Sequence, residues 1–174
     1  MRLITQFFRV SVCAITLVWL VVPQAQEQPK LLGKNTDWVA YELNSGENKI
    51  CYIASEPLKS TPDMENRGST WVLVTHRPIA NIKNEVSVIA GYPYAVGARV
   101  SILIDAKKFE MFTKDNGAWL GSPEEESAIV TAMKRGRRMS VVGYSNSGVT
   151  TTDEYSLLGF TASHRRISAA CGVR

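Results

Sequence analysis

The chain has 174 residues, a formal net charge of +4 and a hydrophobic fraction of 45%. This length suits a single domain, and so small a positive surplus does not indicate nucleic acid as a partner. The motifs HExxH and CxxC, an EF-hand-type acidic loop and a glycine-rich phosphate loop are all absent from the sequence, so we expect no metal and no cofactor.

Residues 1–25 have the pattern of a secretory signal peptide. Two arginines precede an apolar run from Val10 to Val22, and a proline ends that run. Thirteen residues rise only ~20 Å as a helix, short of the ~30 Å hydrocarbon core, so a retained membrane anchor is the weaker alternative. Without a twin-arginine motif, we expect Sec-type export to the periplasm, with outer-membrane association or secretion as further destinations.

Cleavage after Ala25 would remove 25 of the 174 residues, leaving 149, and would lower the net charge from +4 to +2. The remaining chain has no apolar run long enough to span a membrane. It keeps two cysteines, Cys51 and Cys171, and an even number of thiols in an oxidising compartment favours a disulfide. Closing so long a loop would contribute up to ~4–5 kcal/mol. Two separate buried thiols are the alternative.

The rest of the chain reads as a polar lead-in over residues 26–35 and one domain over residues 36–174. Short alternating runs separated by turn residues predict strands, and a long surface loop is expected at residues 56–69, which contain two prolines and several charges. We expect strands at residues 36–43, 48–55, 70–78, 85–91, 99–105, 108–113, 118–120, 137–145 and 149–157.

Two short helices are also expected. Residues 122–136 have Ser122 as N-cap, a proline at the first helical position, Glu125 to complete a capping box and a glycine at the end. Residues 160–171 predict a terminal helix that depends on docking against the rest of the domain. The sum is a mainly β fold, an antiparallel β-sandwich or barrel of about eight or nine short strands with two short helices.

Catalytic groups are scarce. His76 could act as a general base, but no activated nucleophile lies near it in the sequence, so a structural or surface role is favoured. His164 falls on the polar side of the last helix, where exposure to solvent is expected. The serine in GYSNSG, residues 143–148, lacks the glycine spacing of a nucleophile elbow and fits a hairpin turn better. The acidic residues 124–126 are explained as charges at a helix N-terminus.

The densest charge cluster is KRGRR, with the cations Lys134, Arg135, Arg137 and Arg138. It could bind an anionic glycan, lipid headgroups or the acidic face of a partner. The favoured alternative is less specific: two cations matched to the end of a helix, followed by solvated residues that open a strand.

Three stretches together resemble the bacterial invasion-associated locus B family: VTHRPIANIKNEVSVIAGYPY, AIVTAMKRGRRMSVVGYSNSGVTTTDEYSLLGF and the closing ISAAC. The similarity runs from Asp37 to Cys171. It implies an exported, β-rich alphaproteobacterial protein, and some family members are linked to entry into red blood cells. Other members have an extra cysteine shortly after the early tryptophan; here residues 39–41 contain none, which makes pairing of Cys51 with Cys171 the natural choice. No catalytic residue is carried over.

We therefore expect a non-enzymatic periplasmic or cell-surface protein that supports envelope function or host-cell interaction. Its partner would be a protein, a glycan or an envelope component, contacted through exposed loops such as residues 56–69. A small-ligand binding module of the periplasm is the alternative. An enzyme that uses His76 comes third.

Overall fold

A computed structural model describes residues 28–45 and 48–173, so the predicted signal peptide lies outside the described residues. Eleven strands form one antiparallel sheet in the order β1-β2-β3-β5-β6-β9-β8-β7-β10-β11-β4. The strands are β1 Lys30–Asn35, β2 Trp38–Ser45, β3 Asn48–Ser55, β4 Lys59–Thr61, β5 Trp71–Arg77, β6 Ile82–Ile89, β7 Arg99–Ile104, β8 Lys107–Lys114, β9 Gly117–Trp119, β10 Arg138–Tyr144 and β11 Thr150–Ser156. The helices are α1 Pro123–Arg135 and α2 Phe160–Ala170, with a short 3-10 turn at Pro78–Ala80.

The mainly β class with two helices is confirmed, and each of the nine expected strands is present. The sheet is single and ends at β1 and β4, so it is neither a closed barrel nor two separate sheets. The two additional strands are these edge strands. Strand β1 contains a register shift at Gly33, and β4 pairs over only three residues, so neither has the apolar alternation that reveals a strand in a sequence.

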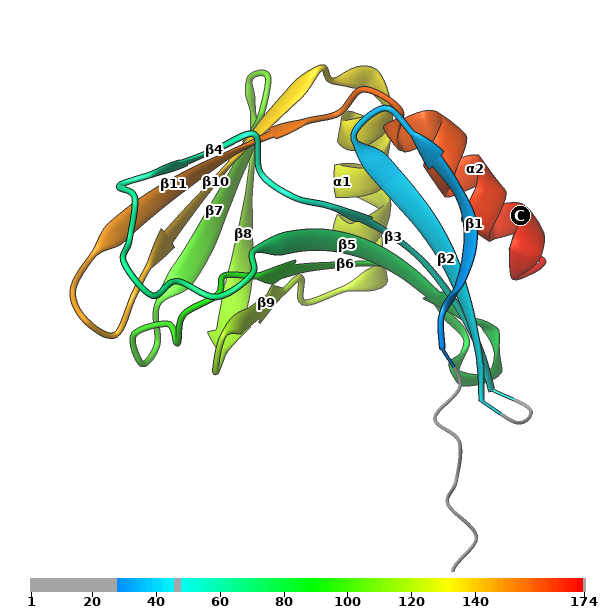
Figure 1. Ribbon diagram of the computed structural model, residues 1–174, viewed down its shortest axis with the longest axis horizontal. Helices are drawn as coiled ribbons and strands as arrows, with labels where there is room; N and C mark the ends of the chain where they lie inside the picture. The colour runs from blue at the N-terminus through cyan, green and yellow to red at the C-terminus, as the bar shows by residue number, and fades with distance from the viewer. Residues whose placement is uncertain (1–27, 46–47, 174) are drawn as a thin grey trace, which may run out of the picture.

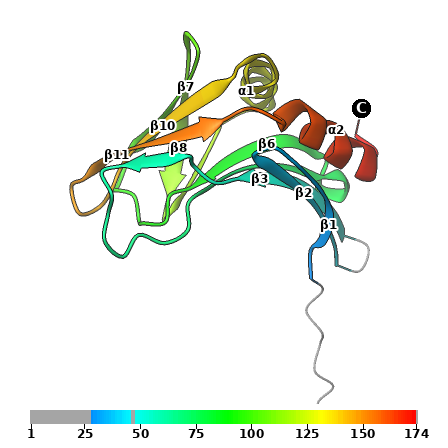
Figure 2. The same ribbon diagram turned by 45° about the horizontal axis from the view of Figure 1, so that its top comes forward.

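The sheet curves around one continuous core (Figure 1). The core contains side chains from strands far apart in the sheet order, as expected for a twisted and curved sheet. Helix α1 packs against β6 and β8, and α2 lies along β1, β2 and β3 (Figure 2). Fully buried core residues from both halves include Val74, Val88, Ile102, Met111, Ile129 and Met133.

Helix α1 begins as the sequence predicts. The Ser122 hydroxyl accepts the Glu125 backbone N–H at 3.2 Å, and Pro123 opens the first turn. The Glu125 carboxylate accepts the Gly121 N–H at 3.0 Å, one residue earlier than in the standard capping box. The local sequence therefore supplies the caps of this terminus.

Helix α2 is held mainly by contacts with strands β1, β2 and β3. Cys51 and Cys171 form the predicted disulfide, with Cα atoms 6.0 Å apart, which joins β3 to the residue after the helix. At the other end of α2, Phe160 packs edge to face on Trp38, with ring centroids 4.9 Å apart. The Ser163 hydroxyl donates to the Trp38 carbonyl at 3.1 Å. The disulfide and these contacts fix both ends of a helix that is too short to be stable alone.

The segment at residues 56–69 is anchored at two points. Strand β4 pairs with β11 at the sheet edge, and Arg67 lies near the end of the segment. The Arg67 guanidinium donates to both carboxylate oxygens of Asp153, at 2.8 and 2.7 Å, and its Nε donates to the Ala90 carbonyl at 2.8 Å. It also lies over the ring of Tyr92, 5.0 Å from the centroid. Part of the expected surface loop is therefore built into the interior.

Candidate functional site

His76 lies in β5 at a bulge, and the bulge supplies its first hydrogen bond. The pairing of β5 with β6 shifts register between Thr75 and Arg77, and Asn84 on β6 adopts a positive φ of 59°. In that conformation the Asn84 backbone N–H donates to His76 Nδ1 at 3.0 Å. Because Nδ1 accepts, the proton of the neutral imidazole must be on Nε2.

The other three bonds close a ring of four hydrogen bonds. His76 Nε2 donates to the Ser168 hydroxyl at 3.2 Å, and that hydroxyl faces His164 Nδ1 at 3.5 Å. His164 Nε2 in turn donates to the Asn84 side-chain carbonyl at 2.7 Å. With both histidines neutral, every donor in the ring meets an acceptor. We call these four residues, Asn84, His76, Ser168 and His164, the histidine ring.

This geometry favours a structural His76 over a general base. His76 donates its proton toward Ser168, so it has no lone pair available to activate that hydroxyl. Burial, with the charges of Lys134 and Lys83 nearby, lowers the pKa of His76 to about 4. The expectation that His164 is exposed was wrong. Its side chain is only 6% exposed, because α2 turns it inward to reach Asn84, and burial lowers its pKa to about 4 as well.

The stretches that carry the family resemblance converge on two interior clusters. THRP and NEVSV, both from the first stretch, supply His76 and Asn84, and the closing ISAAC supplies Ser168, so these three segments meet in the histidine ring beside the disulfide. Two further segments of these stretches meet at Arg67: GYP of the first contributes Tyr92, and TTDEYSLLGF of the second contributes Asp153. Nothing in the sequence pairs Arg67 with Asp153, because 86 residues separate them. The distinctive residues therefore hold the fold together.

One of the three acidic residues expected at the start of α1 has a different role. Glu126 is only 8% exposed, and its carboxyl accepts the Val86 backbone N–H at 2.7 Å. Burial, with the charges of Glu85 and Glu125 nearby, raises its pKa to about 8. The carboxyl is therefore mostly protonated at neutral pH and can fill an interior position beside β6.

An apolar groove lies on the face of β2, β3 and β5 that is turned away from α2. Alternate residues of β2 such as Trp38 face the helix, so Tyr41 faces the opposite side, where it stacks on Tyr52 with ring centroids 5.2 Å apart. The groove has a volume of about 580 Å³ and is lined mainly by Val39, Tyr41, Tyr52, Ala54, Trp71, Leu73 and Ile89. This groove was not expected from the sequence. The signal was present, since these strands are apolar on both faces while helices cover only one.

The four predicted cations belong to a larger surface where connections between elements meet, at the top of Figure 1. The Leu157 N–H donates to the Arg137 carbonyl at 2.9 Å, and the Thr161 hydroxyl lies 3.4 Å from the Lys134 carbonyl. The Asp37 N–H donates to the Leu158 carbonyl at 3.4 Å, which brings in the β1–β2 turn. The turn between β7 and β8 joins them because β7 pairs with β10.

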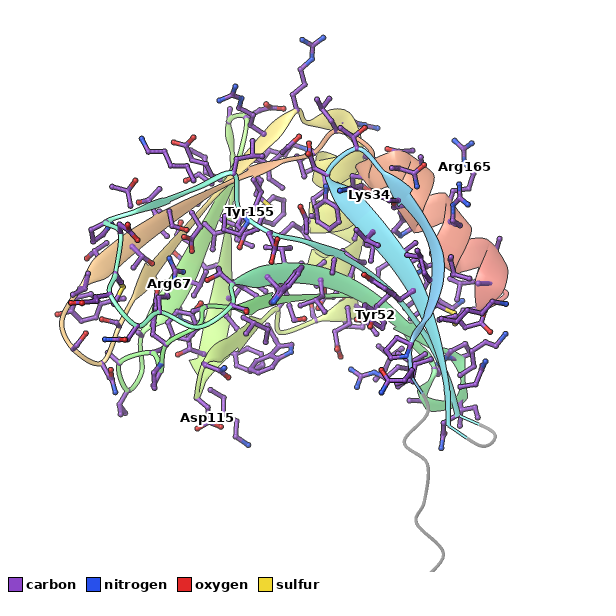
Figure 3. The ribbon with its side chains drawn as sticks, in the orientation of Figure 1. Lys34, Tyr52, Arg67, Asp115, Tyr155 and Arg165 are labelled. Carbon is purple, nitrogen blue, oxygen red and sulfur yellow. A yellow bond between two sulfur atoms is a disulfide. The ribbon has the colours of Figure 1, made fainter. Side chains whose placement is uncertain are left out.

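We call this surface the basic end. It presents seven exposed cations, and Figure 3 shows two of them, Lys34 and Arg165, on the same side of the molecule. Two acidic residues, Asp37 and Asp105, lie in these turns, and exposed Glu56 lines the groove beside Lys34. Within residues 28–45 and 48–173, the seven cations form no ion pair. They are Lys34, Lys107, Lys134, Arg135, Arg137, Arg138 and Arg165.

Fold and site together define a class of protein: one open antiparallel sheet, a C-terminal helix fixed by a disulfide, and polar interior clusters that carry the distinctive motifs. Within this class the chain belongs to the invasion associated locus B (IalB) family, whose model matches residues 38–168. Neither a curated protein nor a solved structure matches the chain. In the described part of the chain, no helix has the length and hydrophobicity to cross a bilayer.

Proposed function

We propose that the mature chain is an exported, non-enzymatic protein of the periplasm or cell surface, which supports envelope function or host-cell interaction by binding an anionic component. The basic end carries this proposal. Its seven cations lie on several elements, in or near the connections that meet there, are exposed, and have no carboxylate partner among the described residues. Charges left free in this way attract an anionic surface, whereas cations in surface ion pairs are already partly neutralised.

The histidine ring supports binding over catalysis. The one serine hydroxyl within reach of His76 already accepts that residue's proton, and the ring places both histidines in the interior. The same residues tie α2 to the sheet, which gives them a structural task. Family membership supports a protein of the IalB type. Export rests on the signal-peptide pattern of residues 1–25.

A salt-gradient experiment with a matched control tests the role of the basic end. The mature chain, residues 26–174, is loaded on a sulfated polysaccharide column as wild type and as the triple variant Arg135→Glu, Arg137→Glu and Arg138→Glu. The control variant Lys59→Glu, Arg99→Glu and Lys114→Glu changes the net charge equally, at exposed positions outside the basic end. We expect the basic-end variant to elute at clearly lower salt than the control. Equal elution of the two folded variants would remove the basic end from the proposal.

A second candidate function is binding of a small apolar molecule, and the groove favours it. Its floor is aromatic and aliphatic, and its volume suits a ligand of drug-like size. The probe is the dye 1-anilinonaphthalene-8-sulfonate, with Leu73→Glu at the groove floor and Val96→Glu at a fully exposed loop position as control. Dye fluorescence that Leu73→Glu removes and Val96→Glu preserves would support this function. Dye binding that neither variant changes would count against it.

A further inference from the structure

We infer that the basic end docks on a membrane surface that contains anionic phospholipid, with Leu158 as an apolar anchor between the cations. This inference rests on the proposed function, because it names the anionic component. We favour lipid over a glycan or an acidic protein face because the cations are widely spread and because an exposed leucine lies among them.

The cations are spread over a broad end of the molecule. They lie in or next to the β1–β2 turn, the β7–β8 turn, the α1–β10 connection and the first half of α2. These segments meet through hydrogen bonds and strand pairing. Lys34 lines one rim of the groove, and Lys107 lines the shallow hollow beside α1. A wide array of cations matches a bilayer, which presents many phosphates in a plane.

Leu158 lies within this array and points its side chain to solvent. It is 55% exposed, whereas Leu157 beside it is 4% exposed and belongs to the core. The Leu158 backbone is fixed on both sides, since its N–H donates to the Ser156 hydroxyl at 3.1 Å and its carbonyl accepts from Asp37. The following Gly159 has a φ of 90° and approaches the Asn35 carbonyl so closely that no side chain would fit there. The leucine is therefore held outward by a rigid turn.

An exposed leucine surrounded by cations distinguishes lipid from the other anionic partners. Phospholipid headgroups place phosphates directly above hydrocarbon, so cations and one apolar side chain can be satisfied together. A sulfated polysaccharide offers anions and hydroxyls, which match the cations and leave Leu158 in a polar environment. Both partners would bind in a salt-dependent manner, because exposed charges are screened beyond ~8 Å at physiological ionic strength. Only binding to lipid should depend on Leu158.

The test uses the mature chain and vesicles of phosphatidylcholine alone or mixed equally with phosphatidylglycerol, read by co-sedimentation at several salt concentrations. We expect binding to the mixed vesicles only, weakened by salt and by the Arg135, Arg137, Arg138→Glu triple variant. Leu158→Ser should weaken binding to mixed vesicles by roughly tenfold. The same variant should elute unchanged from the sulfated polysaccharide column. Val96→Ser, which removes an even more exposed apolar side chain from a loop elsewhere, should change neither measurement.

Leu158→Trp gives a direct readout of insertion. We expect it to bind mixed vesicles at least as tightly as wild type, with a blue shift of tryptophan emission beyond that of the wild-type protein. The lipid inference would be overturned if Leu158→Ser did not weaken vesicle binding, or if the protein bound the polysaccharide and not the vesicles. Either result would leave the proposed function intact. A folded protein that binds neither material would overturn both.

Discussion

The imidazole rings of His76 and His164 meet edge to face inside the protein, with centroids 5.4 Å apart. Each accepts at one nitrogen and donates from the other, which only the neutral forms can do around a closed ring. Protonation of His76 at Nδ1 would set its new N–H against the Asn84 backbone N–H. The ring therefore links the attachment of α2 to pH.

The first prediction concerns acid stability. Both histidines have a pKa of about 4 in the folded protein, against 6.5 ordinarily, so the unfolded chain binds more protons between these values. The contribution of the two histidines to the free energy of unfolding is complete above about pH 6.5 and is lost as pH falls toward 4. We expect the free energy of unfolding in urea to drop by at least about 2 kcal/mol from neutral pH to about pH 4.5. Glu126 titrates in the opposite direction, so the measurement is made in the Glu126→Gln protein. A flat profile would contradict the histidine ring.

The second prediction isolates Glu126 at higher pH. Its folded pKa of about 8 lies above its ordinary 4.5, so the wild-type protein loses stability as pH rises through that window. Glutamine keeps an oxygen to accept the Val86 N–H and cannot ionise. We expect Glu126→Gln to gain stability relative to wild type as pH is raised from about 5 to about 8.5, by a few kcal/mol. Exposed Glu124→Gln is the control and should show little pH-dependent gain.

The third prediction concerns the disulfide between Cys51 and Cys171. Reduction, or Cys171→Ser, removes a covalent constraint on the unfolded chain and should lower the free energy of unfolding by about 2–4 kcal/mol. Hydrogen exchange should rise first in α2, since the bridge anchors its end, and less in α1. Labelling by a thiol reagent of the folded, unreduced protein at either position would show that the bridge does not form in solution.

The fourth prediction concerns the buried pair of Arg67 and Asp153, whose side chains are 8% and 3% exposed. Asp153→Ala leaves an uncompensated buried guanidinium, so we expect a loss of about 3–5 kcal/mol in urea unfolding. The exposed pair of Lys108 and Glu110 gives the comparison, and Glu110→Ala should cost about 1 kcal/mol or less. Similar costs for the two variants would mean that Arg67 does not anchor its segment.

The fifth prediction separates structure from catalysis. Ser168→Ala removes the hydroxyl that an enzyme using His76 would need, and it also breaks two bonds of the histidine ring. We expect lower stability but full rescue of a deletion strain at a temperature where the variant stays folded. The triple variant of Arg135, Arg137 and Arg138 to Glu should rescue poorly. Rescue lost with a folded Ser168→Ala protein would favour the enzyme hypothesis.

The nine central strands and both helices could be predicted from the sequence because their signals are local: alternation of apolar residues, and the cap at Ser122. The edge strands β1 and β4 could not, since an edge strand needs neither a second partner nor a continuous apolar face. For the same reason the sequence could not show that the sheet is open, because closure depends on which strands form its edges.

The histidine ring and the basic end could be predicted only in part. His164 was assigned to solvent because a polar residue on a short helix usually faces water, and its partner Asn84 lies 80 residues away. Lys134, Arg135, Arg137 and Arg138 were visible as a cluster, while Lys34, Lys107 and Arg165 join them only through the fold. The pairing of Cys51 with Cys171 could be predicted because these are the two cysteines outside the predicted signal peptide, residues 1–25.

The strand order also constrains how the molecule is assembled. Trp38 at the start of β2 donates to the Ser156 carbonyl at the end of β11, across 118 residues, and β4 is a strand only because β11 lies beside it. Strands β2, β3, β5 and β6 pair with one another, but β4, Trp38 and Cys51 make contacts with the late part of the chain. Entropy is lost in closing these long loops before the contacts compensate for it. We therefore expect slow, all-or-none folding of the kind seen in proteins of high contact order, with no half of the domain able to form by itself.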